Sequence, residues 1–144
     1  MAVYLDTSCV LKLLWPEPET ARTVALVRAE DRVIVSEVTW LETKVRIQAR
    51  HASGALTRSG ARTLLRKAES LVSTPPFERP TCAAGVLGDA AAQVDVGSRS
   101  SHCRSLDRLH LAAMLGLGLD RLVTNDDARA RAARSLGLMV LLPR

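Results

Sequence analysis

Ala2-Val3-Tyr4-Leu5 is a short apolar run that ends abruptly in Asp6, Thr7 and Ser8. The run predicts a buried strand, and the apolar positions from Val10 to Leu14 predict a helix soon after it. A carboxylate at the carboxyl end of a buried parallel strand points into the crevice where open α/β sheets hold their ligands. Asp6 or Thr7 has an equally good second interpretation, as the N-cap of the following helix. The choice between a ligand-binding carboxylate and a helix cap depends on the rest of the chain.

Strand and helix patterns alternate along the remaining sequence. Strands are predicted at 32–35, 121–124 and 138–142, and the proline-rich connector 74–80 has room for one short edge strand. Helices are predicted at 10–14, 19–30, 38–50, 57–72, 82–94, 106–117 and 126–136, and 97–101 is the most loop-like segment. This alternation predicts an α/β fold with one domain over residues 1–144: a three-layer sandwich with a central, mainly parallel sheet flanked by helices.

Composition narrows the class of protein. Hydrophobic residues make up 47% of the 144 residues, which excludes a disordered chain, and no apolar run is long enough to cross a membrane. Because the N-terminus has no signal-peptide pattern, we expect a cytoplasmic protein. Three widely spaced cysteines argue against a disulfide framework or a thiolate zinc site. The net charge of +5, carried mainly by arginine, favours phosphate-rich partners without proving one.

Three further acidic residues occupy comparable places. Glu42 follows Leu41 on the predicted apolar face of helix 38–50, Asp107 lies in the first turn of helix 106–117, and Asp126 follows the strand 121–124. Each has an ordinary interpretation, since acids stabilise helix N-termini by about 0.3–1 kcal/mol and Glu42 could border a solvated stripe. In a doubly wound sheet, however, Asp6, Asp107 and Asp126 would meet in one crevice, with Glu42 reaching in from its helix.

Clustered carboxylates repel one another unless a cation neutralises them, and a hard divalent ion with oxygen ligands does so. Bound Mg²⁺ or Mn²⁺ lowers the pKa of a water molecule and neutralises charge on a phosphodiester. The pattern therefore predicts a metal site on a basic protein that acts on a polyanion, with one or two ions. Side chains paired to the chain's own arginines, with no room for an ion, would contradict this hypothesis.

Four segments together resemble the PIN-domain family, specifically its VapC-type toxins of toxin–antitoxin pairs. The matching segments are Val3–Ser8, Val35–Glu42, Leu106–Ala112 and Val123–Asp126. The resemblance implies a PIN-like fold and an Mg²⁺- or Mn²⁺-dependent endoribonuclease that hydrolyses RNA phosphodiesters. It also implies a homodimer and a cognate VapB-type antitoxin that obstructs the pocket.

By position, the resemblance makes Asp6 and Asp107 the principal metal ligands, with Glu42 and Asp126 as the remaining acids. Thr7 or Ser8 would bond the carboxylates or the scissile phosphate, and Thr124 would steady the turn at Asp126. Since Asp127 adjoins Asp126, either of the two could be the ligand.

Other interpretations of the chain stay open. A catalytically idle PIN-like binding module would keep the fold for protein contacts, although all four acids are present. A phosphoacceptor signalling domain needs a lysine near its last strand, and Lys12, Lys44 and Lys67 all come too early. We expect His110 to be a packed or surface histidine, and Trp40 to be a packing residue, rather than substrate contacts.

Overall fold

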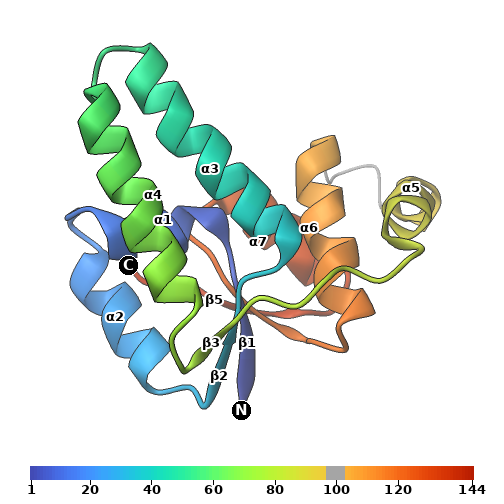
Figure 1. Cartoon of the computed structure of the whole chain (residues 1–144). Coiled ribbons are helices and arrows are strands. Elements are labelled where there is room, and N and C mark those ends of the chain that lie inside the picture. The colour runs from blue at the N-terminus through green and yellow to red at the C-terminus, as the bar shows by residue number, and fades with distance from the viewer. Residues whose placement is uncertain (97–102) are drawn as a thin grey trace.

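The fold is built on a five-stranded sheet in which every neighbouring pair of strands is parallel. In the computed structural model, which describes residues 1–96 and 103–144, the strand order is β3-β2-β1-β4-β5. The strands are β1 (Ala2–Leu5), β2 (Arg32–Ile34), β3 (Phe77–Glu78), β4 (Arg121–Val123) and β5 (Met139–Leu141). Figure 1 shows them crossing the middle of the molecule. The predicted segment 97–101 lies outside the described residues.

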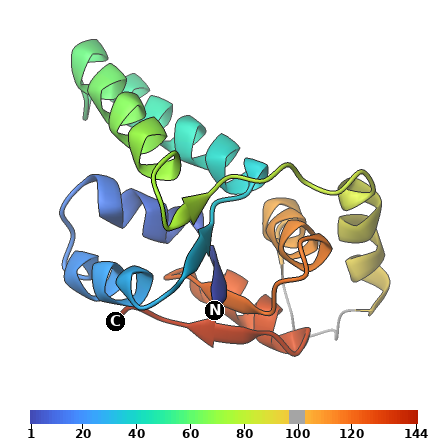
Figure 2. The same cartoon turned by 60° about the horizontal axis from the view of Figure 1, so that its bottom comes forward.

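Helices cover both faces of this sheet (Figure 2). Their bounds are α1 (Thr7–Leu14), α2 (Thr20–Arg28), α3 (Glu37–Ala52), α4 (Arg58–Val72), α5 (Val86–Val96), α6 (Ser105–Gly116) and α7 (Asp127–Ser135). The predicted α/β class, with its parallel sheet between helices, is confirmed.

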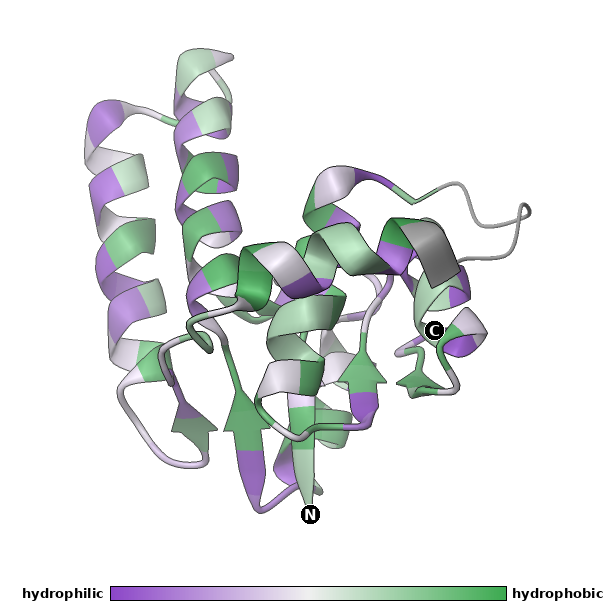
Figure 3. Ribbon diagram, turned by 90° about the vertical axis from the view of Figure 1, so that its right-hand side faces the viewer, coloured by the Kyte–Doolittle hydropathy of each residue, from purple (hydrophilic) through white to green (hydrophobic). Residues whose placement is uncertain are grey.

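Alternate residues of β1 enter two different cores, as the period of a strand requires. Val3 and Leu5 pack with buried residues of α1, α2, α3 and α4, whereas Tyr4 packs with α6 and α7. The strands are mostly apolar because both of their faces are covered. In Figure 3 most of the arrows are largely green, with purple at the starts of some strands and along one arrow. The proline-rich connector supplies the edge strand β3, as predicted.

Strand β1 marks the point where the direction of winding reverses. The chain first moves from β1 to β2 and β3 on one side, and later returns to place β4 and β5 on the other. The carboxyl ends of β1 and β4 are therefore neighbours, and the connections that leave them diverge. Crevices at such switch points are where ligands bind in open α/β sheets.

Two helices begin at other residues than predicted, one because of a local cap and one because of a distant side chain. Helix α1 begins at Thr7 rather than Val10, since Asp6 caps it by accepting a hydrogen bond from the Thr7 N–H. Helix α5 begins at Val86 rather than Cys82, because the Cys82 N–H donates to Glu37 on α3 at 2.8 Å.

The predicted apolar stripe on α3 was also wrong. Leu41 and Val45 are 59% and 56% exposed, while Thr39 and Thr43 are fully buried. Their hydroxyls can be buried because they are satisfied: Thr43 donates to the Thr39 carbonyl at 2.8 Å, and Thr39 to the Leu5 carbonyl at 3.2 Å. The hydrophobic pattern alone therefore placed the buried face of α3 about one residue away from where it lies in the structure.

Within the described ranges 1–96 and 103–144, no helix has the length and apolarity needed to cross a membrane.

Candidate active site

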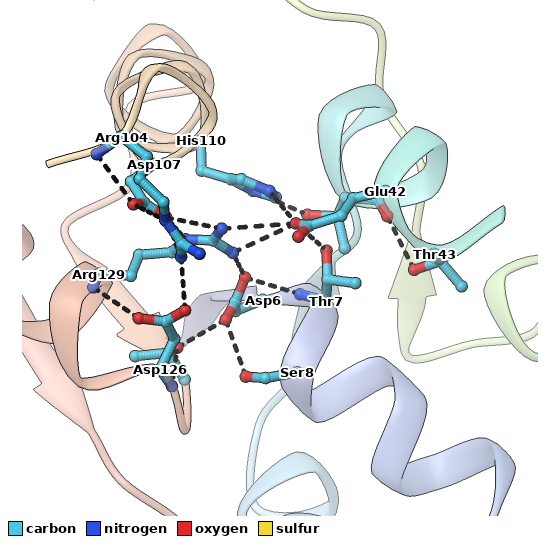
Figure 4. A network of polar contacts seen from close by, with 12 residues as sticks. Asp6, Thr7, Ser8, Glu42, Thr43, Arg104, Asp107, His110, Asp126 and Arg129 are labelled. Atoms are coloured by element: carbon cyan, nitrogen blue, oxygen red, sulfur yellow. Dashed lines mark hydrogen bonds and ion pairs between the residues drawn. The ribbon is translucent and has the colours of Figure 1, made fainter. Parts of the chain in front are cut away.

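The four predicted acids meet at the carboxyl edge of the sheet (Figure 4). Asp6 follows β1 and Asp126 follows the neighbouring β4, whereas Asp107 and Glu42 reach in from α6 and α3. Asp6 and Asp107 are completely buried, and the side chains of Glu42 and Asp126 are 15% and 28% exposed. The cluster therefore has a buried floor and a partly open side.

Both carboxylate oxygens of Asp6 accept hydrogen bonds from neighbouring polar groups. One carboxylate oxygen accepts the Thr7 N–H at 2.7 Å, and the other accepts the Ser8 and Thr124 hydroxyls at 2.8 and 2.6 Å. Asp6 is thus both the N-cap of α1 and a member of the cluster, so the two interpretations of this residue are compatible.

Thr124 connects Asp6 to Asp126. Its hydroxyl donates to Asp6 and accepts the Asp126 N–H at 3.0 Å, while Asp126 caps α7 by accepting the Arg129 N–H at 3.0 Å. Asn125, the residue before this cap, donates its N–H to the Ser8 hydroxyl at 3.0 Å. Burial alone would raise the pKa of Asp126, but the Arg129 N–H and the Arg104 guanidinium outweigh it and lower that pKa.

Asp107 is paired with Arg104, the residue just before α6. The Arg104 Nε donates to Asp107 at 2.8 Å, and its Nη2 reaches both Asp107 and Asp126, at 3.1 and 2.8 Å. Asp107 also accepts a hydrogen bond from the backbone N–H of Arg104 at 3.2 Å. The hydrogen bonds to Asp107 raise the pKa of Arg104, which therefore stays charged.

Glu42 is held by a series of side-chain contacts that begins at Tyr4 in β1. Its Oε2 accepts the Thr7 hydroxyl at 2.8 Å and His110 Nε2 at 2.7 Å, and the other ring nitrogen of His110 lies 2.9 Å from the buried Tyr4 hydroxyl. Burial tends to raise the pKa of Glu42, but the bonds from His110 and Thr7 prevail and lower it. His110 is fully buried, and its ring also orients a site carboxylate.

Arg129 occupies the middle of the cluster and touches all four acids. Its guanidinium is 2% exposed and contacts Asp6, Asp107 at 2.9–3.0 Å and Glu42 at 3.4–3.5 Å, while its backbone N–H binds Asp126. Burial lowers the pKa of Arg129 to about 10, which still leaves it charged at neutral pH. The N–H donors of a guanidinium occupy the acceptor oxygens of a carboxylate. Arg129 therefore competes with any ion for Asp6 and Asp107.

Space for a small ion remains beside the arginine. A hollow of about 60 Å³ is lined by the carboxylates of Asp6, Glu42 and Asp126, by Thr7, Ser8 and Leu11, and by three arginines, Arg46, Arg104 and Arg129. This volume exceeds the roughly 10–15 Å³ that one water molecule needs. Ligand atoms of Asp6, Glu42 and His110 also lie within 4.8 Å of one another. The donor set is dominated by carboxylate oxygen and therefore fits a hard divalent ion in kind, although arginines already neutralise part of it.

Sequence reasoning missed both arginines, but α7 does contain a signal for one of them. Arg129 precedes Ala132 and Ala133 by three and four residues, and all three are buried. A charged residue on the apolar face of a helix is informative because it needs a buried partner. Asp127, by contrast, lies outside the cluster, where its exposed side chain pairs with Arg144.

Comparison with known proteins agrees with this geometry. Residues 3–135 match the PIN domain family model, and the chain therefore belongs to the PIN-domain family. Over its whole length it is similar to "Ribonuclease VapC46" from Mycobacterium tuberculosis (strain ATCC 25618 / H37Rv), with 31% identity over 147 aligned positions that cover 99% of this chain and 98% of that protein. The predicted likeness to VapC-type proteins is confirmed.

Solved structures with low sequence identity share the fold. M. tuberculosis VapC20, described as a "Sarcin-Ricin loop cleaving toxin", aligns with a TM-score of 0.70 and 17% identity over 90% of this chain and 94% of its own. VapBC2 from Rickettsia felis, bound to a DNA fragment from its promoter, aligns with a TM-score of 0.69 and 13% identity over 99% and 98%.

Proposed function

We propose that this protein is a metal-dependent endoribonuclease and the toxin of a toxin–antitoxin pair. The observation that carries the proposal is the convergence of Asp6, Glu42, Asp107 and Asp126 on one partly open hollow at the switch point of the sheet. The names of the relatives, a ribonuclease and a toxin that cleaves the sarcin–ricin loop, support the same chemistry.

We assign Mg²⁺ or Mn²⁺ as the cofactor, held by Asp6, Glu42 and Asp126 at the hollow with Asp107 behind them. Asp126 is preferred to Asp127 because only Asp126 lines the hollow. When bound, the ion supplies a lowered water pKa and neutralises charge on the phosphodiester. The chain's own part is positioning: Ser8 and Thr124 hold Asp6, while Thr7 and His110 hold Glu42 toward the hollow.

The surroundings of the hollow suit RNA. Arg46 lines it and also lines a larger hollow of about 320 Å³ that Trp15 and Arg50 border. Glu42, Arg46 and Arg50 follow one another at four-residue intervals and so lie along one face of α3. A basic track that leads away from the carboxylates gives the RNA backbone a place beside the site.

A VapB-type antitoxin is the partner we propose, because three of the structural neighbours are toxin–antitoxin assemblies from R. felis, Klebsiella pneumoniae and Haemophilus influenzae. We also infer a homodimer in the cytoplasm. Expression without the antitoxin should then arrest growth.

A second candidate has one specific observation in its favour. Ion pairs with Arg129 and Arg104 already engage the carboxylates of Asp6 and Asp107. A catalytically idle PIN-like module could tolerate these pairs, because it needs no carboxylate for a metal ion. The two candidates differ in turnover: only the nuclease cleaves RNA in a manner that depends on the metal.

The test is cleavage of structured RNA by the purified chain with Mg²⁺, with Mn²⁺ and with EDTA. We expect cleavage in both metals and none in EDTA. Asp126→Asn should lose most activity, whereas the matched control Asp127→Asn should retain it, because Asp127 points away from the hollow. Equal cleavage in EDTA would refute the metal mechanism, and no cleavage under any condition would favour the idle module.

A further inference from the structure

Arg129 has a role that a metal site alone does not require. An arginine whose side chain is 2% exposed and whose contacts include four acids is rare in proteins, because a buried charge is costly unless it is paired. The residue is placed by α7: its N–H satisfies the Asp126 cap, and from that position the side chain extends under the other three carboxylates.

We propose that Arg129 is a resident cation of the carboxylate cluster, so that the site assembles without metal and accepts one divalent ion rather than two. This inference rests on the proposed metal site and concerns how many ions that site takes. Arg129 is here a positioning residue: it holds Asp6 and Asp107 in place through its guanidinium.

Charge balance supports a single ion. Four carboxylates face the guanidinium groups of Arg104 and Arg129, and Arg46 lines the same hollow, so no more than two negative charges remain. One divalent ion is therefore enough to balance the cluster, whereas a second would leave it positive.

The geometry agrees with the charge count. The guanidinium of Arg129 binds Asp6 and Asp107, and the hollow of about 60 Å³ beside it is lined by Asp6, Glu42 and Asp126 and by Arg104 and Arg129 themselves. Asp107 does not line that hollow and is engaged by both arginines. An ion on the Asp107 side would have to displace a guanidinium that makes several charge-assisted hydrogen bonds.

The experiment counts bound Mn²⁺ per chain and measures thermal unfolding in EDTA and in Mn²⁺. Wild type should bind one ion and show nearly the same Tm in both media. Arg129→Met removes the charge but keeps a long side chain; we expect its Tm in EDTA to fall by about 10–20 °C. Mn²⁺ should restore most of that loss and bind twice per chain.

Two further variants separate this role from general destabilisation. Arg131→Met, on the exposed side of the same helix, should behave as wild type in both measurements. Arg129→Lys keeps a positive charge and should still bind one ion. Two ions bound by wild type or by Arg129→Lys would overturn the proposal, as would an Arg129→Met protein that folds equally well in EDTA. Should Arg129→Met fold in neither medium, the counts for wild type and Arg129→Lys decide.

Failure of this inference and failure of the proposed function give different results. Wild type that binds two ions and cleaves RNA retains the nuclease assignment but loses the resident cation. Wild type that binds one ion without cleaving RNA keeps the resident cation and loses the nuclease. Wild type that binds no ion overturns both.

Discussion

Asp6→Asn is the substitution that most directly separates the stability of the site from its chemistry. The replacement keeps the shape of the side chain but removes one negative charge from a fully buried position. Thr7, Ser8, Thr124 and Arg129 all donate to the native carboxylate. The asparagine amide can accept through one oxygen only, so at least one hydroxyl must turn to a new partner.

The expected loss of stability is smaller than for a simple broken ion pair. Removing one partner of a buried pair costs about 3–5 kcal/mol when the other charge is left alone. Here Arg129 keeps Asp107 at 2.9 Å and the longer contact with Glu42. We therefore expect about 1–3 kcal/mol, which corresponds to a Tm decrease of about 3–12 °C for a domain of this size. RNA cleavage in Mg²⁺ should nevertheless fall at least about 100-fold, because Asp6 lines the ion's hollow.

The assay combines urea unfolding with single-turnover RNA cleavage, measured below the temperature at which the variant unfolds. Asp120→Asn is the matched control, since Asp120 is an exposed acid at the opposite end of β4. It should change stability by no more than about 0.5 kcal/mol and leave cleavage unchanged. A folded Asp6→Asn protein that cleaves RNA at the wild-type rate would refute the reasoning.

The remaining predictions concern groups that lie beneath the cluster. Tyr4→Phe removes the hydroxyl that lies 2.9 Å from His110, so we expect a loss of about 1–3 kcal/mol in urea unfolding and a roughly 10-fold slower cleavage as Glu42 loses its support; unchanged cleavage would show that this chain of contacts does not position Glu42. Burial raises the pKa values of Cys9 and Tyr4 to about 12, from 9.0 and 10.0. Their contribution to stability is therefore complete below about pH 9 and is lost as the pH rises toward 12, by up to about 1.4 kcal/mol per pH unit for each group. Unfolding measured from pH 7 to 11 should show this decline, and Cys9→Ala should make it shallower; an equally steep decline in that variant would contradict the assignment to Cys9.

The sequence by itself determined the architecture and the four acids. Short apolar runs separated by amphipathic helices predict a parallel sheet between helical layers, because only that arrangement covers both faces of such strands. The end of each run also located Asp6 and Asp126, since a strand that stops at a polar residue leaves it at the sheet edge. These features are local, so a single sequence contains them.

Only the tertiary structure decided what neutralises those acids. Arg104 and Arg129 are three residues from Asp107 and Asp126, but a local pattern does not show that Arg104 also reaches Asp126 or that the buried Arg129 meets Asp6 and Glu42. The same holds for the burial of Thr39 and Thr43, whose hydroxyls are satisfied within the fold while Leu41 and Val45 face outward. The physical reason is common to both cases. The free energy of burying a polar group depends on partners that arrive from distant parts of the chain, whereas periodicity records only the average hydrophobicity of a face.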